Sequence, residues 1–173
     1  RTAGTVNLAG TMDNSAGYTL NDTRGTLNLS GGTVNGGTIT AAPATTSQLV
    51  ASAGTSTLNG VALDANLTLN NNTTVSVTGG LNLAAGRTIS LNTAGSTTTL
   101  RFDGTQSLTG AGTVVFGGTS SPNVVRPGAA GQTLTIGSGI TIESGTGTGT
   151  VGLTGATVQN QGLIRADTSG QTI

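Results

Sequence analysis

A short strand unit recurs along the chain and restricts how the chain can fold. Each unit has an apolar residue, a central residue that is usually small or polar and a second apolar residue, and turns rich in glycine, asparagine and threonine separate the units. Side chains alternate along a strand, so each unit directs two apolar side chains to one face. The series comprises Val6-Asn7-Leu8, Leu27-Asn28-Leu29, Leu67-Thr68-Leu69, Val75-Ser76-Val77, Leu81-Asn82-Leu83, Ile89-Ser90-Leu91, Leu100-Arg101-Phe102, Val114-Val115-Phe116, Leu134-Thr135-Ile136, Ile140-Thr141-Ile142 and Val151-Gly152-Leu153.

Stacking is the arrangement that buries units this short, because no segment of helical periodicity separates them. Every third unit recurs after roughly 22 to 26 residues, a spacing typical of solenoid repeats. We therefore expect an all-β fold, a right-handed parallel β-helix (β-solenoid) with about three short strands per coil. The pairs compared are Leu67 and Ile89, Val75 and Leu100, Ile89 and Val114, and Val114 and Ile140.

The domain organisation follows from the even distribution of these units. Residues 1–173 are expected to form a single β-helix segment, with residues 41–56, rich in alanine, serine and threonine, as a loop or coil irregularity. Alternating apolar sequence reaches Val6 and Leu163, so the terminal coils would present unpaired strand edges. We expect those edges to be covered by flanking repeats of a longer polypeptide or by end-to-end self-association into a fibre.

Composition removes several function classes. Only 7% of the 173 residues are charged, and six arginines balance six acidic residues without forming a basic patch, which argues against nucleic-acid binding. No apolar run approaches the roughly 20 residues that span a bilayer, so no membrane insertion by this segment is expected. Histidine and cysteine are absent, which removes imidazole bases, thiol nucleophiles and the commonest zinc ligands.

The acidic residues give no catalytic or metal-binding signature. They are scattered singly, as Asp13, Asp22, Asp64, Asp103, Glu143 and Asp167. We therefore expect no catalytic, cofactor-binding or metal-binding residues, and a protein that is not an enzyme. A carbohydrate-active β-helix enzyme or a carbohydrate-binding module stays open as an alternative, because stacking of coils can bring two carboxylates together.

The charged residues have a structural interpretation. Pairs two residues apart are expected on one outward strand face, namely Asp22/Arg24, Arg101/Asp103 and Arg165/Asp167. Pairs about one coil apart are expected to meet across adjacent coils and to fix their register, namely Asp64/Arg87, Asp103/Arg126 and Glu143/Arg165. Asn7, Asn28 and Asn82 are expected to point outward into side-chain hydrogen-bond ladders.

Threonine pairs raise an ice-binding alternative, since such solenoids display flat arrays of threonine. The pairs, which do not recur at the coil spacing, are Thr38/Thr40, Thr55/Thr57, Thr97/Thr99, Thr133/Thr135 and Thr146/Thr148/Thr150. We therefore expect no flat lattice, and we ascribe these residues to the preference of threonine for strands.

Two segments carry a resemblance that covers nearly the whole chain. They are Gly25-Thr26-Leu27-Asn28-Leu29-Ser30-Gly31-Gly32-Thr33-Val34 and Val158-Gln159-Asn160-Gln161-Gly162-Leu163-Ile164-Arg165-Ala166. The pattern resembles filamentous-haemagglutinin-like adhesins and autotransporter passenger domains of bacteria. The resemblance implies a structural or adhesive extracellular surface module that contributes to cell-surface or matrix attachment, with host or matrix glycans as partners and the bacterial cell surface as its location.

Overall fold

The structure, a computed structural model, describes residues 4–119 and 122–173 and contains a single sheet of 19 strands wound into a solenoid. Every pairing that joins two strands is parallel. The described residues contain no helix, and therefore none that could cross a membrane. The expected all-β parallel β-helix is confirmed, with about seven coils.

The strands lie on three faces, one strand per face in each coil. Face 1 contains β1 (Thr5–Leu8), β4 (Thr26–Ser30), the start of β7 (Leu49–Asp64), β8 (Leu67–Leu69), β10 (Thr88–Thr93), β13 (Thr113–Gly118), β16 (Thr141–Ser144) and β19 (Leu163–Arg165). Face 2 contains β2 (Thr11–Asp13), β5 (Thr33–Asn35), the middle of β7, the start of β9 (Thr73–Leu83), β11 (Thr98–Phe102), β14 (Asn123–Pro127) and β17 (Gly149–Val151). Face 3 contains β3 (Tyr18–Leu20), β6 (Thr38–Ala41), the ends of β7 and β9, β12 (Gln106–Gly110), β15 (Thr133–Ile136) and β18 (Thr157–Asn160).

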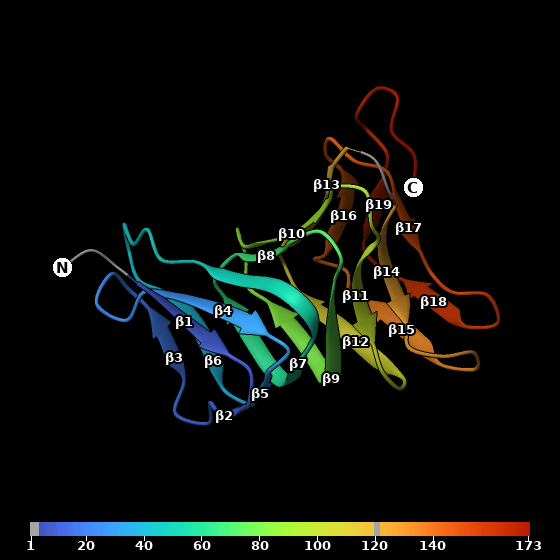
Figure 1. Ribbon diagram of the computed structural model, residues 1–173. Helices are drawn as coiled ribbons and strands as arrows, with labels where there is room; N and C mark the ends of the chain where they lie inside the picture. Colours follow the sequence, from blue (N-terminus) through green and yellow to red (C-terminus); the bar gives the residue numbers. More distant parts are fainter. Residues whose placement is uncertain (1–3, 120–121) are drawn as a thin grey trace.

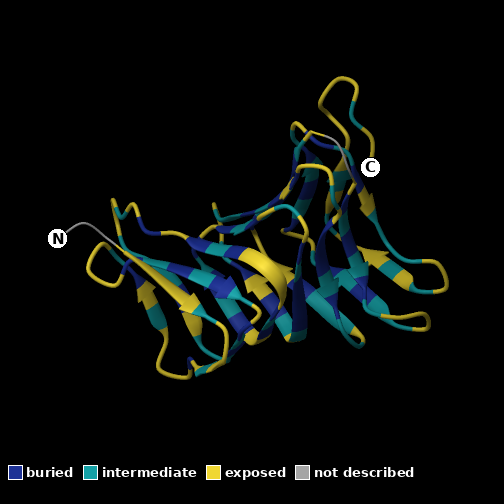
Figure 2. Ribbon diagram, in the orientation of Figure 1, coloured by how far each residue is buried: buried dark blue, intermediate teal, exposed yellow. Residues whose placement is uncertain are grey.

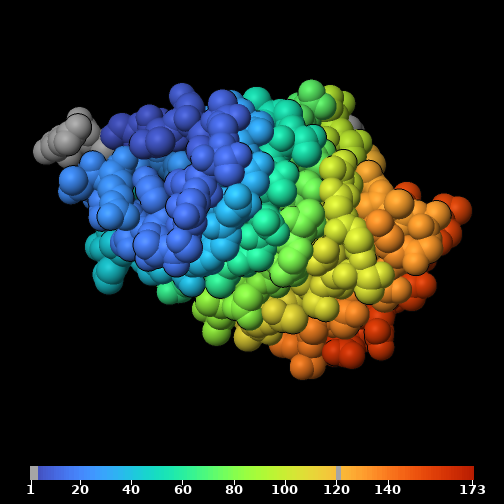
Figure 3. Space-filling model, turned by 90° about the horizontal axis from the view of Figure 1, so that it is seen from below, coloured from blue at the N-terminus to red at the C-terminus, as the bar shows by residue number. Residues whose placement is uncertain are grey.

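The coils follow one another along the molecule in sequence order. Figure 1 shows the chain advancing from the blue coils at one end to the red coils at the other. In the space-filling view the colours form successive bands, as expected when each coil contacts mainly its neighbours (Figure 3). The first and last coils therefore lie at opposite ends of the stack.

The core fills the interior of the coils with one apolar column per inward position. Figure 2 shows buried segments alternating with more exposed ones along the central strands, as a period of two requires. On face 1 one column runs through Leu27, Leu49, Leu67, Ile89 and Val114, each at most 1% exposed. The core is therefore one continuous cluster of apolar side chains that runs through the stacked coils.

Corners between faces need backbone conformations that favour glycine. Gly54 and Gly60, each with φ of 62°, turn β7 from face 1 to face 2 and then to face 3. Because both glycines lie within one continuous strand, the ladder passes round two corners without a loop.

Most of the expected strand units and much of the register are confirmed. Leu67 lies opposite Ile89 and Ile89 opposite Val114, as the spacing predicted. Val114, however, lies opposite Ile142 rather than Ile140, so the prediction for this coil was wrong by two residues. Ile140 and Ile142 are both buried, and the alternating pattern alone does not say which of them pairs with Val114.

Two further segments differ in detail from the sequence pattern. The unit Val151-Gly152-Leu153 is strand only as far as Val151, where Gly152 adopts a φ of 120°. Residues 41–56 divide into Ala41 at the end of β6, a loop at 42–48 and the first half of β7 from Leu49. A register shift where Ser30 pairs with Ala53 makes this coil irregular.

Candidate functional site

Two of the ion pairs expected across adjacent coils are present. Arg87 Nε lies 2.8 Å from Asp64 Oδ1 at the turn from face 3 to face 1. Arg165 is in register with Glu143 on face 1, and its Nε donates to Glu143 Oε2 at 3.0 Å. Both pairs join one coil to the next and so favour the observed register.

The predicted pair of Asp103 with Arg126 is not formed. Arg126 lies opposite Arg101, in the same register that sets Val125 opposite Leu100. The coil between them is therefore longer, by two residues, than the separation of Asp103 from Arg126 in the sequence. Arg126 Nη1 instead donates to the carbonyl oxygens of Pro127, at 3.1 Å, and Gly128, at 3.2 Å. The prediction was wrong because the separation of Asp103 and Arg126 along the chain does not equal the length of this coil.

Pairs predicted two residues apart form where the arginine of the pair lies in a strand. Arg101 Nη2 donates to Asp103 Oδ2 at 3.0 Å. Arg165 Nε lies 3.1 Å from Asp167 Oδ2. Because Arg165 also binds Glu143, that hydrogen bond and the charges of Asp167 and Glu143 raise the pKa of its guanidinium above the usual value.

The predicted pair of Asp22 with Arg24 is wrong, because both residues lie in a turn after β3 and not in a strand. The Arg24 guanidinium lies 5.2 Å from the centre of the Tyr18 ring and donates to Thr19 O at 3.4 Å. Asp22 faces the following coil, where it accepts hydrogen bonds from the 42–48 loop.

The Asp22 carboxylate anchors the 42–48 loop. Its Oδ1 accepts from Thr45 Oγ1 at 2.8 Å, from Thr46 N at 2.9 Å and from Ser47 Oγ at 3.3 Å. The hydrogen bonds from Thr45 and Thr46 hold the pKa of Asp22 below its usual value. Sequence reasoning missed this role, although three consecutive hydroxyl residues one coil after an acid are a recognisable signal.

A groove of about 740 Å³ lies beside this loop. The turn from face 3 to face 1 is long at 42–48, consists of Ala65 and Asn66 in the next coil, and lengthens again at 84–87. The groove lies over the short turn of Ala65 and Asn66, between the longer turns of the coils on either side. Besides the hydroxyl residues of the loop itself, its polar lining comprises Gln48, Asn66, Thr68, Arg87, Thr88 and Ser90, and its apolar lining includes Leu20 and Ala65.

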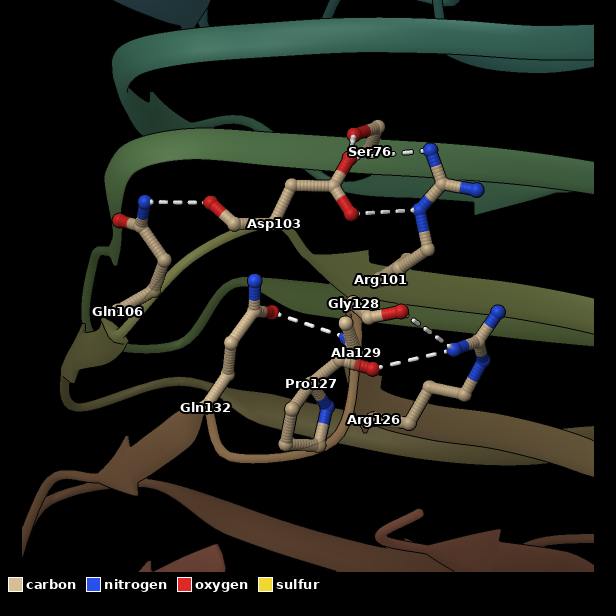
Figure 4. A network of polar contacts seen from close by, with 9 residues as sticks. All are labelled: Ser76, Arg101, Asp103, Gln106, Arg126, Pro127, Gly128, Ala129 and Gln132. Atoms are coloured by element: carbon tan, nitrogen blue, oxygen red, sulfur yellow. Dashed lines mark hydrogen bonds and ion pairs between the residues drawn. The ribbon is translucent and has the colours of Figure 1, made fainter. Parts of the chain in front are cut away.

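A second polar network lies on face 2 and its corner toward face 3 (Figure 4). Asp103 accepts a hydrogen bond from Ser76 Oγ, in the preceding coil, and from Arg101. Burial raises the pKa of Asp103, but these two hydrogen bonds and the charges of Arg101 and Arg126 together hold it below the usual value. Gln106 Nε2 binds the Asp103 carbonyl oxygen at 2.8 Å, and Gln106 Oε1 accepts from Gly80 N at 2.7 Å.

The outward columns also form side-chain ladders. Asn28 Nδ2 donates to Asn7 Oδ1 at 2.7 Å, and Asn82 Nδ2 donates to Thr109 Oγ1 at 3.2 Å, as predicted. A ladder not predicted runs along face 2, where Thr78 Oγ1 donates to Asn59 Oδ1 and Asn59 Nδ2 to Asn35 Oδ1, each at 3.1 Å.

The threonine prediction was partly wrong. Thr55 and Thr99 share one column of face 2 through Thr74, so threonines do recur at the coil period. The column is interrupted by Val124 in the next coil before Thr150 continues it. The hydroxyl array therefore covers three consecutive coils and then breaks.

Asp64, Asp103, Glu143 and Asp167 form ion pairs with arginines, whereas Asp13 and Asp22 accept hydrogen bonds in turns. Glu143 and Asp167, the two that meet at one point, both bind Arg165, and their side chains are 22% and 46% exposed. Across residues 4–119 and 122–173, no group of three or more acidic residues is placed to hold a metal ion.

Comparison of the chain with protein-family models, with curated proteins and with solved structures gives no match. The fold and the contacts within it therefore carry the functional argument.

Proposed function

We propose that the chain is a structural and adhesive module of the bacterial cell surface, a stiff β-solenoid segment that contributes to surface or matrix attachment. The observation that carries the proposal is the unbroken parallel stack, in which every coil is paired with the next through three faces. Chains of this architecture hold their shape through main-chain ladders and need no special residue to do so. The extracellular location is supported by composition and by the resemblance of the sequence pattern.

The two end coils support an extended assembly. Val6 is 45% exposed, whereas Leu27, its partner in the next coil, is 1% exposed; at the other end Ile164 is only partly buried, whereas its partner Ile142 is fully buried. Open strand edges with apolar side chains are sites for further strand pairing. We infer that another coil of the same kind covers each edge, supplied by the same polypeptide or by another copy of the chain.

Light scattering across a concentration series tests the supply by other copies. End-to-end association gives a mass that rises with concentration, and either Val6→Asp or Ile164→Asp, each of which places a charge in the apolar column at one edge, lowers that mass. A mass that stays at one chain throughout assigns the covering coils to the same polypeptide. If the amides at the end strands of a single isolated chain are protected from hydrogen exchange, the edges are already covered, which would contradict both sources of a covering coil.

The adhesive part of the proposal is assigned to the groove beside the 42–48 loop. Hydroxyl and amide groups line it, and its one arginine is neutralised by Asp64. This lining suits the hydroxyl groups of a neutral oligosaccharide, and the volume is within the range of small-molecule sites.

Retention of glycan-coated beads on the immobilised chain under flow tests the adhesive part. Thr68→Ala with Ser90→Ala, which removes two outward hydroxyls from the groove, is expected to reduce retention. Thr113→Ala, on the same face but outside the groove, serves as the matched control and is expected to retain beads. If the unaltered chain retains no beads, the adhesive part of the proposal is wrong and only the structural role as a stiff spacer stands.

A further inference from the structure

Arg101 and Arg126 place two positive charges directly opposite each other on face 2. They are in register in adjacent coils, about 4.8 Å apart along the stack. Like charges in this position destabilise a sheet unless something compensates them. Figure 4 shows the two guanidinium groups one above the other on the same side of the network.

The available negative charge compensates only one of them. Asp103 is bound by Ser76 Oγ and by Arg101, whose Nε lies 2.8 Å from Asp103 Oδ1. Among residues 4–119 and 122–173, no carboxylate oxygen lies within 4.0 Å of the Arg126 guanidinium. By contrast, Arg87 and Arg165 are ion-paired, and Arg24 lies over an aromatic ring. The network therefore carries one uncompensated positive charge.

The Arg126 side chain is held in place by its own turn. Nη1 is occupied by the carbonyl oxygens of Pro127 and Gly128, and the turn is closed by Gln132 Oε1, which accepts from Ala129 N at 2.9 Å. Gly128 packs so closely on the preceding coil that an added Cβ would lie 2.3 Å from Asp103 Oδ1. Nε and Nη2 of Arg126 remain for an outside acceptor, on a group that loses little conformational entropy when it binds.

A fixed guanidinium beside a second one matches the chemistry of an oxyanion. Planar guanidinium groups donate two parallel hydrogen bonds to a carboxylate or sulfate group and are preferred over ammonium groups for that purpose. Thr74 and Thr78 are partly exposed in the two neighbouring columns of face 2, and their hydroxyl groups suit the sugar around such a group.

We propose that Arg101 and Arg126 form a binding site for the carboxylate or sulfate group of an acidic polysaccharide. The polysaccharide as the source of the anion rests on the proposed adhesive function. The oxyanion site itself does not, and it can be tested with small molecules on the unaltered chain.

The test is an NMR titration of the isotope-labelled chain at low salt with sodium glucuronate, glucose 6-sulfate and, as a neutral probe, glucose. Either anion is expected to shift the Nε–H signals of Arg101 and Arg126 and the amide of Gly128, and glucose is expected to leave them in place. Shifts by one anion alone identify the source of the oxyanion. Binding should weaken at about 0.5 M sodium chloride, where screening shortens the range of the charges.

Arg126→Gln is expected to weaken binding by about tenfold, the effect of one lost charge-assisted hydrogen bond pair. Arg24→Gln removes the same charge elsewhere and is expected to bind within about twofold of the unaltered chain. Arg126→Lys keeps the charge without the planar group and is expected to lie between them. Equal loss in the Gln variants at positions 24 and 126, or absence of shifts at Arg126 with either anion, would overturn the site.

A folding check separates these outcomes from damage to the stack. Arg126→Gln relieves a like-charge contact, so its thermal midpoint should equal that of the unaltered chain or exceed it. If that variant unfolds, the Lys variant and the direct shifts at Arg126 decide the matter. Neither result depends on oligomer formation or on bead retention, so failure of this site and failure of the proposed function are distinguishable.

Discussion

The early coils of the solenoid, up to Ile89, and the later coils differ in their length along the chain and in the side chains that fill their core. In the early coils Val6 pairs with Leu27, Leu27 with Leu49 and Leu49 with Leu67, and the core is aliphatic. In the later coils Ile89 pairs with Val114 and Val114 with Ile142, so these two coils take up more of the chain than any of the early ones; the last coil, in which Ile142 pairs with Ile164, is again as short as the early coils. Both phenylalanines of the chain lie in this later part of the core, at positions 102 and 116.

The extra residues of the later coils enter the corners. The turn from face 2 to face 3 is Gly36–Gly37 in an early coil and residues 128–132 in a later one, whereas the strands on either side keep their pairing. Residues 129–131 of that turn are exposed, and inside the later coils a phenyl ring fills more of the interior than an aliphatic side chain does. The later coils therefore differ from the early ones in the size of their core side chains, while the parallel pairing stays constant.

The largest expected effect comes from removing a ring in the later region. Phe116→Ala should lower the free energy of unfolding by about 3–5 kcal/mol, because the ring is fully buried and rigid neighbours cannot close the cavity. Leu29→Ala in the early region should cost about 2–4 kcal/mol. Urea denaturation of both variants measures the difference. A larger cost at Leu29 would show that the early coils are the more tightly packed region.

A second prediction concerns the fit of the Phe116 ring against the next coil. An added Cβ at Gly149 would lie 1.8 Å from Phe116 Cδ2, so Gly149→Ala should cost about 1–3 kcal/mol through overpacking. Gly10→Ala, where nothing lies within 4 Å, is the control and should be nearly neutral. Combined with Phe116→Ala, the Gly149 change should cost much less than it does alone. Additive costs would show that the ring is not what excludes a side chain there.

A third prediction compares the ion pair of Asp64 in the early region with that of Asp103 in the later region. Asp103→Asn should lower the free energy of unfolding by about 1 kcal/mol, because it leaves two in-register arginines uncompensated, whereas Asp64→Asn, which leaves a single arginine without its partner, should cost a few tenths of a kcal/mol. The pKa of Asp103 is lowered in the fold, so its contribution is present above the ordinary value of 3.8 and is lost as the pH falls through the folded pKa. Unfolding curves of Asp103→Asn and the unaltered chain should therefore converge as the pH falls below the lowered pKa of Asp103. A gap that persists there would contradict the ionic explanation.

The smallest effect on global stability is expected at the loop of the early region. Asp22→Asn weakens the acceptor for Thr45, Thr46 and Ser47, so hydrogen exchange at the Thr46 amide should accelerate while the thermal midpoint stays nearly constant. The lowered pKa of Asp22 predicts the same acceleration as the pH falls below about 3.8. Asp13→Asn, at another exposed turn, is the control. Unchanged exchange at Thr46 would show that the loop is held by other contacts.

The early region also shows how much of the fold could be predicted from the sequence. Units with two apolar residues, such as Leu67-Thr68-Leu69, were found as strands because burial of both ends gives a clear period of two. Strands with one inward apolar residue, such as β5 around Val34, gave no such signal. Their backbone is extended because the neighbouring coils template it, which no local pattern records.

Some contacts of the candidate sites could likewise be predicted from the sequence, and others could not. Asp64 and Arg87 could be paired from sequence because their separation along the chain is close to the length of the local coil, in which Leu67 pairs with Ile89. Asp103 and Arg126 have the same separation, but the local coil is longer and sets Arg101 opposite Arg126. The groove could not be predicted, because it depends on the lengths of three successive turns and no single residue marks it.

The 42–48 loop has a consequence for display of foreign sequence. Ala42 N is bonded to Leu20 O at 2.9 Å, and Thr45 N closes a turn on Ala42 O at 3.3 Å. Pro43 and Ala44 form the tip of that turn, and both of its ends are fixed to the preceding coil, through Leu20 and through Asp22. A peptide grafted between Pro43 and Ala44 would leave and re-enter at two anchored points, so the solenoid can carry a guest epitope without a change in register.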